Sequence, residues 1–272
     1  MPDQNRLRAY ARGGHRTVAG WLDGTAIAMI AALSTQQERA GIRGGVCEIG
    51  IHHGRLFILL HLLSHDGERC AAYDLFEMQA QNVDGSGLGD EVAFRNNLLE
   101  HGCDLSRIVV KSRNSLELRA DEILEDVGPV RLFSVDGGHT ADITANDLAL
   151  ADAVLGRGGL VILDDFFNEA WPGVAEGASR YLSSPRCRLV PVAIGGNKFI
   201  FAHADFAERY RAGLEDLPGY LRSTQHVFGA DVVVIRKATR VERLASTRAW
   251  KVLRATSTGR WIRSAAMRVL RS

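Results

Sequence analysis

Two short apolar runs that each end in carboxylates limit the folds open to this chain. The first run ends in Asp136, with His139 three residues later, and the second ends in the pair Asp164-Asp165. Short apolar runs flanked by glycine are typical of buried parallel strands. The carboxyl ends of such strands meet at one edge of an open α/β sheet, where ligands bind. We therefore expect three carboxylates, which suit a divalent cation, beside a histidine that can move a proton.

The rest of the chain alternates between apolar runs and helical periodicity. Strands are predicted at 45–49, 69–74, 108–111, 131–135 and 160–163, with a closing hairpin of 188–194 and 198–203. Helices are predicted at 26–39, 55–64, 91–101, 115–124, 141–155 and 174–182. This order predicts the α/β fold class: a doubly wound, mostly parallel seven-stranded sheet with an antiparallel C-terminal hairpin. Residues 232–235 are either one more strand or an apolar link.

We divide the 272 residues into three parts, of which the last is set apart by its charge. We expect a helical segment at 1–40, the main domain at 41–236 and a basic amphipathic tail at 237–272. The tail has ten Lys or Arg and one acid, a charge of +9, which leaves −8 on residues 1–236 because the whole chain carries +1. An acidic body offers no obvious nucleic-acid surface, so nucleic acid is not an expected partner.

The cysteines and the basic tail indicate where in the cell the protein is expected to be. The four cysteines form no CxxC pair, and no apolar run reaches the ~20 residues of a membrane span, which indicates a reducing, cytoplasmic setting. The tail places Trp250 and Trp261 among its cations. Such a segment suits peripheral contact with the inner face of a membrane, and it equally suits docking on the acidic body or on a second subunit.

A glycine-rich turn follows the first predicted strand. It runs from Glu48 through Gly50 to Gly54 and differs from the GxGxxG pattern of nicotinamide and flavin folds. Gly50 permits a sharp turn close to a ligand, and Gly54 permits tight packing of the next helix. Asp74 ends the second strand, where a carboxylate can accept hydrogen bonds from both hydroxyls of a ribose.

This pattern resembles the class I methyltransferases that depend on S-adenosylmethionine (SAM). The resemblance implies that Glu48 faces the methionine end of SAM and that Asp74 faces the ribose. It implies an adenine site in the turn after the third strand. The cofactor-binding positions that it implies are Glu48, Gly50, Ile51, Gly54, Asp74, Asn114, Ser115 and Asp136.

A narrower resemblance rests on Asp136, His139, the Asp164-Asp165 pair and the sequence 171–174. These positions resemble the metal-dependent O-methyltransferases of the macrocin and mycinamicin type, which methylate hydroxyls of sugars. The resemblance implies Asp136, Asp164 and Asp165 as ligands of Mg²⁺ or another divalent cation. It implies Asp136 and His139 as catalytic residues, with His139 as the general base. An aspartate pair after a strand also suits a helix cap, and His139 also suits a hydrogen-bonded loop.

Several polar and aromatic residues are candidates for binding the acceptor. Within the long loop 76–90, residues 79–90 resemble a substrate lid, and their amides and acids suit sugar hydroxyls, although a mobile solvent loop is nearly as consistent. Trp171 can stack on a sugar face or simply pack. The candidates are His52, His53, Gln81, Asn82, Asp84, Trp171 and Lys198.

These features and resemblances together predict a SAM-dependent, Mg²⁺-assisted O-methyltransferase. The predicted acceptor is a hydroxyl of a sugar or glycoside, in a glycan or a natural product. Methylation of a catechol-like or other small hydroxylated metabolite is the first alternative, and hydroxylation, from a resemblance to cephalosporin hydroxylases, is a weaker one. A non-catalytic binding protein on the same fold is the alternative from a different class. The resemblance also implies a homo-oligomer.

Overall fold

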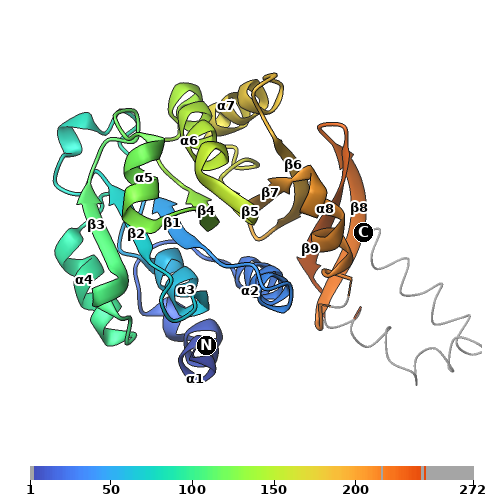
Figure 1. Ribbon diagram of the computed structural model, residues 1–272, viewed down its shortest axis with the longest axis horizontal. Coiled ribbons are helices and arrows are strands. Elements are labelled where there is room, and N and C mark those ends of the chain that lie inside the picture. The colour runs from blue at the N-terminus through green and yellow to red at the C-terminus, as the bar shows by residue number, and fades with distance from the viewer. Residues whose placement is uncertain (1–2, 216, 240–241, 243–272) are drawn as a thin grey trace, which may run out of the picture.

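Nine strands form one mixed sheet in the part of the chain that the structure describes (Figure 1). This computed structural model describes residues 3–215, 217–239 and 242. The strand order is β3-β2-β1-β4-β5-β7-β6-β9-β8. The first five strands in this order are parallel, and β7 runs antiparallel to both of its neighbours. The strands are β1 (Gly45–Ile49), β2 (Cys70–Asp74), β3 (Ile108–Ser112), β4 (Val130–Val135), β5 (Leu155–Asp164), β6 (Leu189–Gly195), β7 (Lys198–His203), β8 (Tyr220–Val227) and β9 (Ala230–Lys237).

Helices cover both faces of the sheet. Figure 1 shows α5, α6 and α7 on one side of the sheet, with α2, α3 and α4 on the other. The α-helices are α1 (Gln4–Arg12), α2 (Gly24–Arg39), α3 (Arg55–Leu63), α4 (Glu91–Glu100), α5 (Ala120–Val127), α6 (Ala141–Val154), α7 (Pro172–Leu182) and α8 (Ala204–Ala212). Short 3₁₀ turns lie at η1 (Gly14–Arg16), η2 (Gln79–Gln81) and η3 (Leu105–Arg107).

Each face of the sheet has its own hydrophobic core, because successive side chains of a strand point to opposite faces. Leu132 and Leu160 pack on the side of α2 and α3. Phe133 and Val161, the next residue of each strand, pack on the side of α5 to α7. The strands β1, β4 and β5 are therefore buried on both faces, which is why their sequences read as continuous apolar runs.

The strand register brings the predicted site residues to one edge. Ile49, Val135 and Leu163 are register partners on β1, β4 and β5. The residues that follow them are Gly50, Asp136 and Asp164, which end neighbouring strands at the same level. The structure therefore confirms the prediction that Asp136 and Asp164 lie at the same edge of the sheet.

The predicted α/β class is confirmed, but the prediction of seven strands was too low. The apolar segment at 232–235 is part of β9, and β8 pairs with it at the sheet edge. β8 was not predicted because it is exposed along most of its length and lacks alternating apolar residues. The helix predicted at 115–124 begins only at Ala120, and α8 was not predicted as a helix. α1 lies within the segment 1–40 that was expected to be helical, although no bounds were predicted for it.

The division into 1–40, 41–236 and 237–272 stays a prediction. Of the basic tail, only residues 237–239 and 242 are described, so its predicted amphipathic character lies outside the described residues. Among the helices that the structure describes, none has the length and apolar character that crossing a bilayer requires.

Candidate active site

A cavity of ≈ 590 Å³ opens at the carboxyl ends of β1, β2, β4 and β5. The loop 76–90 and the segment 19–21 contribute to its walls. It collects most of the site residues predicted from the sequence. Those that line it are Glu48, Gly50, Ile51, His52, Asp74, Gln81, Asn82, Asn114, Ser115, Asp136, His139, Asp164, Asp165 and Trp171. Gly54, His53, Asp84 and Lys198 lie behind this lining and contact residues that belong to it or to its supporting elements.

The turn between β1 and α3 has the tight geometry that its glycines predict. Gly50 has φ +85°, and a Cβ atom there would lie 1.7 Å from the carbonyl oxygen of Asp136. Gly54 has φ +88°, and a Cβ atom there would lie 2.4 Å from the ring of Phe94. Any side chain at either position would therefore collide with its neighbour, and glycine is required for the turn to pack.

Asp74 holds this turn in place. One of its carboxylate oxygens accepts hydrogen bonds from the backbone N–H groups of Ile51 (2.6 Å) and His52 (2.8 Å). The other accepts from the N–H of Phe76 (2.8 Å). Each carboxylate oxygen has more than one acceptor site, so Asp74 can shape the turn and still face the cavity as an acceptor.

Glu48 presents a buried carboxylate to the same half of the cavity. Its side chain is 2% exposed, and its Oε2 atom has no hydrogen-bond partner among the described residues. Burial raises the pKa of Glu48 to about 8, although the nearby charge of Lys198 opposes the rise. A buried carboxylate oxygen without a donor is costly unless a ligand supplies one. The ammonium group of a bound amino-acid moiety is such a donor.

The turn after β3 closes the far end of this half. Asn114 and Ser115 line the cavity, and the amide of Asn114 donates a hydrogen bond (2.9 Å) to the side chain of Gln81 in the loop 76–90. The loop and the turn after β3 therefore meet over the position that the resemblance gives to the adenine.

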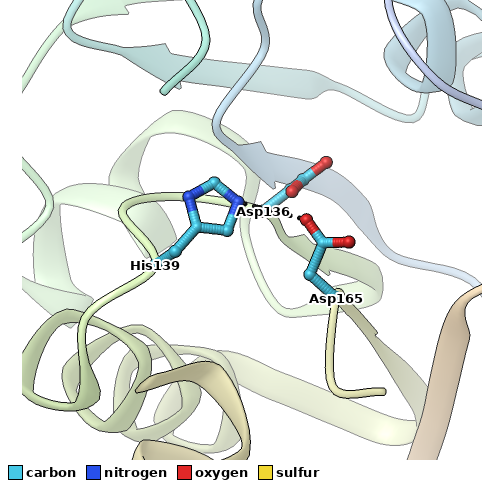
Figure 2. A group of neighbouring side chains, drawn as sticks. All are labelled: Asp136, His139 and Asp165. Carbon is cyan, nitrogen blue, oxygen red and sulfur yellow. Dashed lines mark hydrogen bonds and ion pairs between the residues drawn. The ribbon is translucent and has the colours of Figure 1, made fainter. Parts of the chain in front are cut away.

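The other half contains a cluster of acids around one histidine. Asp136, His139 and Asp165 each offer one ligand atom, and these atoms lie within 4.8 Å of one another (Figure 2). Figure 2 shows the His139 ring, which comes from the loop after β4, pointing toward Asp165. The Nε2 atom of His139 lies 3.2 Å from Asp165 Oδ2. Asp165 has φ +59°, an unusual backbone for a residue with a side chain, which marks a position held by its surroundings.

The surroundings raise the pKa of Asp136 and of His139 and lower the pKa of Asp165. Burial and the adjacent carboxylate of Asp164 raise the pKa of Asp136 well above its usual range. Burial would raise the pKa of Asp165 too, but hydrogen bonds from His139, Asn168 and Asn197 lower it to about 2. Burial acts to lower the pKa of His139, and the hydrogen bonds to Asp165 and Asp84 outweigh it and raise this pKa.

Both carboxylate oxygens of Asp164 already have partners within the protein. Its Oδ1 atom accepts hydrogen bonds from the backbone N–H of Asp165 (2.9 Å) and from Asn197 (3.1 Å). Its Oδ2 atom forms an ion pair with Lys198, whose side chain is 2% exposed. The structure therefore places Lys198 on the acids of the cluster rather than in the lining of the cavity.

Of the other residues predicted to bind the acceptor, Trp171 and His52 line the cavity and His53 does not. Trp171 stacks on the ring of His139, with centroids 4.4 Å apart and planes at 25°. His52 lines the cavity and lies 5.6 Å from the ring of Trp21, whereas His53 packs behind it with one ring nitrogen 2.8 Å from His52 Nδ1. The acceptor-binding roles of these residues stay predictions.

Sequence reasoning missed several residues of the site. Asn197 lies in the predicted hairpin turn and Asn168 lies three residues after Asp165, so both positions could have been included from proximity alone. Trp21 and the segment 19–21 reach the cavity from a part of the chain without any periodic signal. The sequence predicts a sugar-binding role for Asp84, but its carboxylate contacts His139.

The residues present fit both SAM and a divalent cation. The partnerless oxygen of Glu48 suits the amino-acid end of SAM, and the acceptor atoms of Asp74 suit hydroxyl donors. Oxygen donors of Asp136 and Asp165 near an imidazole are the type of donor set that Mg²⁺ or Mn²⁺ uses, and their mutual repulsion is what a cation would relieve.

Comparisons with known proteins agree with the fold. Residues 47–166 match the sequence profile of a methyltransferase domain. No curated protein sequence matches the chain significantly. Several solved structures share the fold.

Three O-methyltransferase structures illustrate this likeness. The O-methyltransferase NovP superposes with a TM-score of 0.54 at 14% identity, covering 65% of this chain and 80% of NovP. CalS11, described as a TDP-rhamnose 3'-O-methyltransferase of calicheamicin biosynthesis, has a TM-score of 0.50 at 19% identity, covering 65% and 79%. The O-methyltransferase from Bacillus cereus in complex with SAH has a TM-score of 0.50 at 15% identity, covering 74% and 91%.

Proposed function

We propose that this chain, whose residues 47–166 match the profile of a methyltransferase domain, transfers the methyl group of SAM to a hydroxyl of a sugar or glycoside with the help of a divalent cation. The observation that carries the proposal is the shared cavity. A half suited to SAM, with Glu48 and Asp74, opens directly onto the acid cluster around His139. A donor and an acceptor bound in the two halves would meet in line, and alignment is the main requirement because the SAM sulfonium is already reactive.

The first role of the chain is to bind and orient SAM. Glu48 would accept from the ammonium group of the methionine moiety, and Asp74 would accept from the ribose hydroxyls. Asn114 and Ser115 would border the adenine. The rigid turn at Gly50 sets the spacing between these groups and the acid cluster, because it packs directly on the backbone of Asp136.

The second role is to prepare the acceptor hydroxyl. Asp136 and Asp165 are the carboxylates that would hold the cation. Asp164, which the sequence also predicted as a ligand, lies outside this group because Asn197 and Lys198 engage its two oxygens. A cation there lowers the pKa of an acceptor hydroxyl and fixes the position of its oxygen. Asn168 and Asn197 fix Asp165 through hydrogen bonds, so the carboxylate would not need to reorganise when the acceptor binds.

The third role is to remove the proton. His139 lies at the cavity, with its Nε2 atom 3.2 Å from Asp165 Oδ2, and its ring, once neutral, would accept the hydroxyl proton as the methyl group moves. Trp171 covers one face of the ring and limits its rotation. His139 would return the proton to solvent after the methylated product leaves.

A sugar acceptor is favoured over a catechol by the polar groups around the cluster. The side chains of Asn168, Asn197 and Asn82 border the cavity. Their amide N–H groups already donate within the protein, so their carbonyl oxygens are the atoms that would accept hydrogen bonds from sugar hydroxyls. NovP and CalS11 are described as O-methyltransferases, the latter acting on a rhamnose derivative. A catechol would instead favour a narrow aromatic slot.

The homo-oligomer and the contacts of the basic tail also stay proposals, which light scattering and vesicle binding would test.

The test begins with calorimetric titration of SAM into the full chain, with and without Mg²⁺. Methyl transfer from radiolabelled SAM would then be measured on methyl pyranosides, aryl glycosides and catechol. We expect SAM binding, and transfer to a glycoside that stops with chelator and returns with Mg²⁺. Asp165→Asn should weaken Mg²⁺ binding at least about tenfold. The matched variant Asp205→Asn, on the exposed first turn of α8, should not. Absence of SAM binding would overturn the proposal, and transfer to catechol alone would replace the sugar acceptor.

A further inference from the structure

We propose that Trp21 binds the acceptor: its indole ring stacks on a flat apolar part of the acceptor that lies beyond the sugar ring to be methylated. The inference rests on the proposed function, because it describes the acceptor of the same site. Its first readout is equilibrium binding, which needs no turnover.

The Trp21 side chain is 78% exposed, although it belongs to the lining of the cavity. A single exposed apolar side chain is ordinary in a globular protein. Trp21 has company, because Val83 of the loop 76–90 lines the same cavity and is 70% exposed. At the acid cluster, by contrast, the side chains of His139 and Asp165 are only 12% and 15% exposed. The cavity therefore has apolar side chains at its open mouth and polar groups at its shielded end.

The backbone of Trp21 is held in place on both sides. The guanidinium group of Arg55, on α3, donates hydrogen bonds to the carbonyl oxygens of His15 (2.5 Å) and Gly20. Leu22, the next residue, is buried, and α2 begins directly after it and its capping residue. An indole on a fixed backbone has only two free torsions, so covering it with a ligand costs little conformational entropy. Trp21 therefore offers a large, rigid apolar surface to a molecule that enters the cavity.

A continuous wall of the cavity leads from Trp21 to the acid cluster. The ring centroids of Trp21 and His52 lie 5.6 Å apart. A Cβ atom at Gly87, in the loop over the cavity, would lie 4.0 Å from the His52 ring. The neighbouring Ser86 places its Oγ atom 3.0 Å from His139 Nδ1. All five residues line the cavity. A sugar whose hydroxyl lies at the acid cluster would therefore meet Trp21 through a substituent that extends along this wall.

The chemistry of the indole ring determines which substituents it would bind. Indole offers a flat apolar face and a single N–H donor, so it stacks on other flat apolar faces and gains little from a set of hydroxyls. An aromatic ring has such a face, and so does one side of a sugar ring. We therefore expect acceptors that carry a second ring on the methylated sugar to bind more tightly than the sugar alone.

The test is calorimetric titration of glycosides into the full chain saturated with SAH and Mg²⁺. The probes are the methyl and phenyl pyranosides of glucose, galactose and rhamnose, together with the disaccharide cellobiose. We expect a phenyl pyranoside to bind the native chain about tenfold more tightly than the methyl pyranoside of the same sugar. Trp21→Ala should remove this preference and leave the Kd of the methyl pyranoside within about twofold. Trp21→Phe, which keeps a flat ring, should retain part of the preference.

A matched control and the SAM affinity show whether the effect is specific. Leu99→Ala truncates an apolar side chain on α4 that is 60% exposed and lies outside the cavity lining, so it should keep the native preference. The Kd for SAM should change less than about twofold in Trp21→Ala, which also shows that the variant folds. Equal preferences in the native chain and in Trp21→Ala would overturn the inference. So would the absence of glycoside binding, or a loss of SAM affinity in place of glycoside affinity.

The same probes separate the two kinds of flat face. A gain that cellobiose shares with the phenyl pyranoside of glucose would show that a second sugar ring is sufficient. A gain confined to the phenyl pyranosides would identify an aromatic substituent. Either result supports stacking on Trp21, provided that Trp21→Ala removes the gain.

Methyl transfer from radiolabelled SAM to the same glycosides tests the proposed function separately. If no glycoside is methylated but the phenyl preference depends on Trp21, the proposed function fails and the inference holds. If a glycoside is methylated and Trp21→Ala raises its KM no more than Leu99→Ala does, the inference fails and the proposed function holds. We expect Trp21→Ala to raise the KM of a phenyl pyranoside about tenfold and to change kcat less than about twofold.

Discussion

Lys198 forms an ion pair with Asp164 inside the sheet, because the two residues are register partners on the antiparallel strands β7 and β5. The same ammonium nitrogen lies 3.9 Å from Asp136 Oδ2. The β6–β7 hairpin thus supplies a fixed positive charge directly beneath two carboxylates that end neighbouring strands. The buried carboxylates of Asp136 and Asp164 repel each other electrostatically. The positive charge of Lys198 offsets part of this repulsion.

Lys198→Met should destabilise the protein in the absence of metal. Removing one partner of a buried ion pair costs about 3–5 kcal/mol, because the other charge stays buried and unpaired. Added Mg²⁺ should recover more stability in this variant than in the native chain, since a cation can neutralise the same acids. Thermal melts with and without Mg²⁺ measure both effects. Lys111→Met, which removes a partly exposed ion pair with Asp126, should cost only about 0–1 kcal/mol. Equal Mg²⁺ shifts in all three proteins would contradict the expectation.

His139→Gln should separate its role as a base from a role as a metal ligand. As a base, His139 supplies about 100- to 10,000-fold in rate, and its loss should spare the Mg²⁺ and SAM affinities. As a ligand in the group of Figure 2, its loss should weaken Mg²⁺ binding at least about tenfold. Calorimetry on the variant distinguishes the two. The exposed His226→Gln serves as the control for loss of an imidazole.

The pH–rate profile should show a rising limb that is displaced upward from the ordinary histidine pKa. The hydrogen bonds from His139 to Asp165 and Asp84 raise its pKa above the ordinary 6.5, so the ring stays protonated and inactive as a base until the pH exceeds that value. The rate should therefore increase with pH through a midpoint above 6.5. A midpoint below 6.5 at saturating substrates would contradict this interpretation of the histidine environment.

SAM affinity should depend on pH through Glu48. Because burial raises the pKa of Glu48 to about 8, the free protein holds this carboxyl protonated at neutral pH. The SAM ammonium prefers the ionised form, so binding should release a proton and tighten as the pH rises from 6 towards 8. Calorimetry in buffers of different ionisation enthalpy counts the proton. Glu48→Gln should bind SAM more weakly at pH 8 and lose the pH dependence, and a proton count of zero in the native chain would refute the assignment.

The ion pair of Arg131 with Glu68 should be a determinant of stability and not of activity. It is buried (2.9 Å, with side chains 1% and 7% exposed) and lies at the start of β4, away from the cavity. Arg131 also donates to Gln37 and to the carbonyl oxygen of Leu63. Glu68→Gln should lower the free energy of unfolding by about 3–5 kcal/mol in urea titrations, with SAM affinity preserved. A loss below ~1 kcal/mol would show that the pair is solvated.

Local sequence predicted much of the fold because burial leaves a direct pattern. The strands β1, β4 and β5 are apolar on both faces, and their glycine and aspartate ends mark where they stop. The edge strand β8 has no such pattern, because it is mostly exposed and is held by main-chain pairing with β9. The register between two strands depends on both strands, so it cannot be predicted from a short stretch of sequence around one of them.

The sequence by itself determined that Asp136, His139, Asp164 and Asp165 share one rim, since parallel strands must end at the same edge of a sheet. It also determined the tight turn at Gly50, where only glycine fits. Only the tertiary structure decided the partners of these groups: Lys198 for Asp164, and Asp84 for His139. Those contacts join positions 34 and 55 residues apart along the chain. They depend on strand pairing and on the path of the loop 76–90, which are fixed by packing across the whole domain.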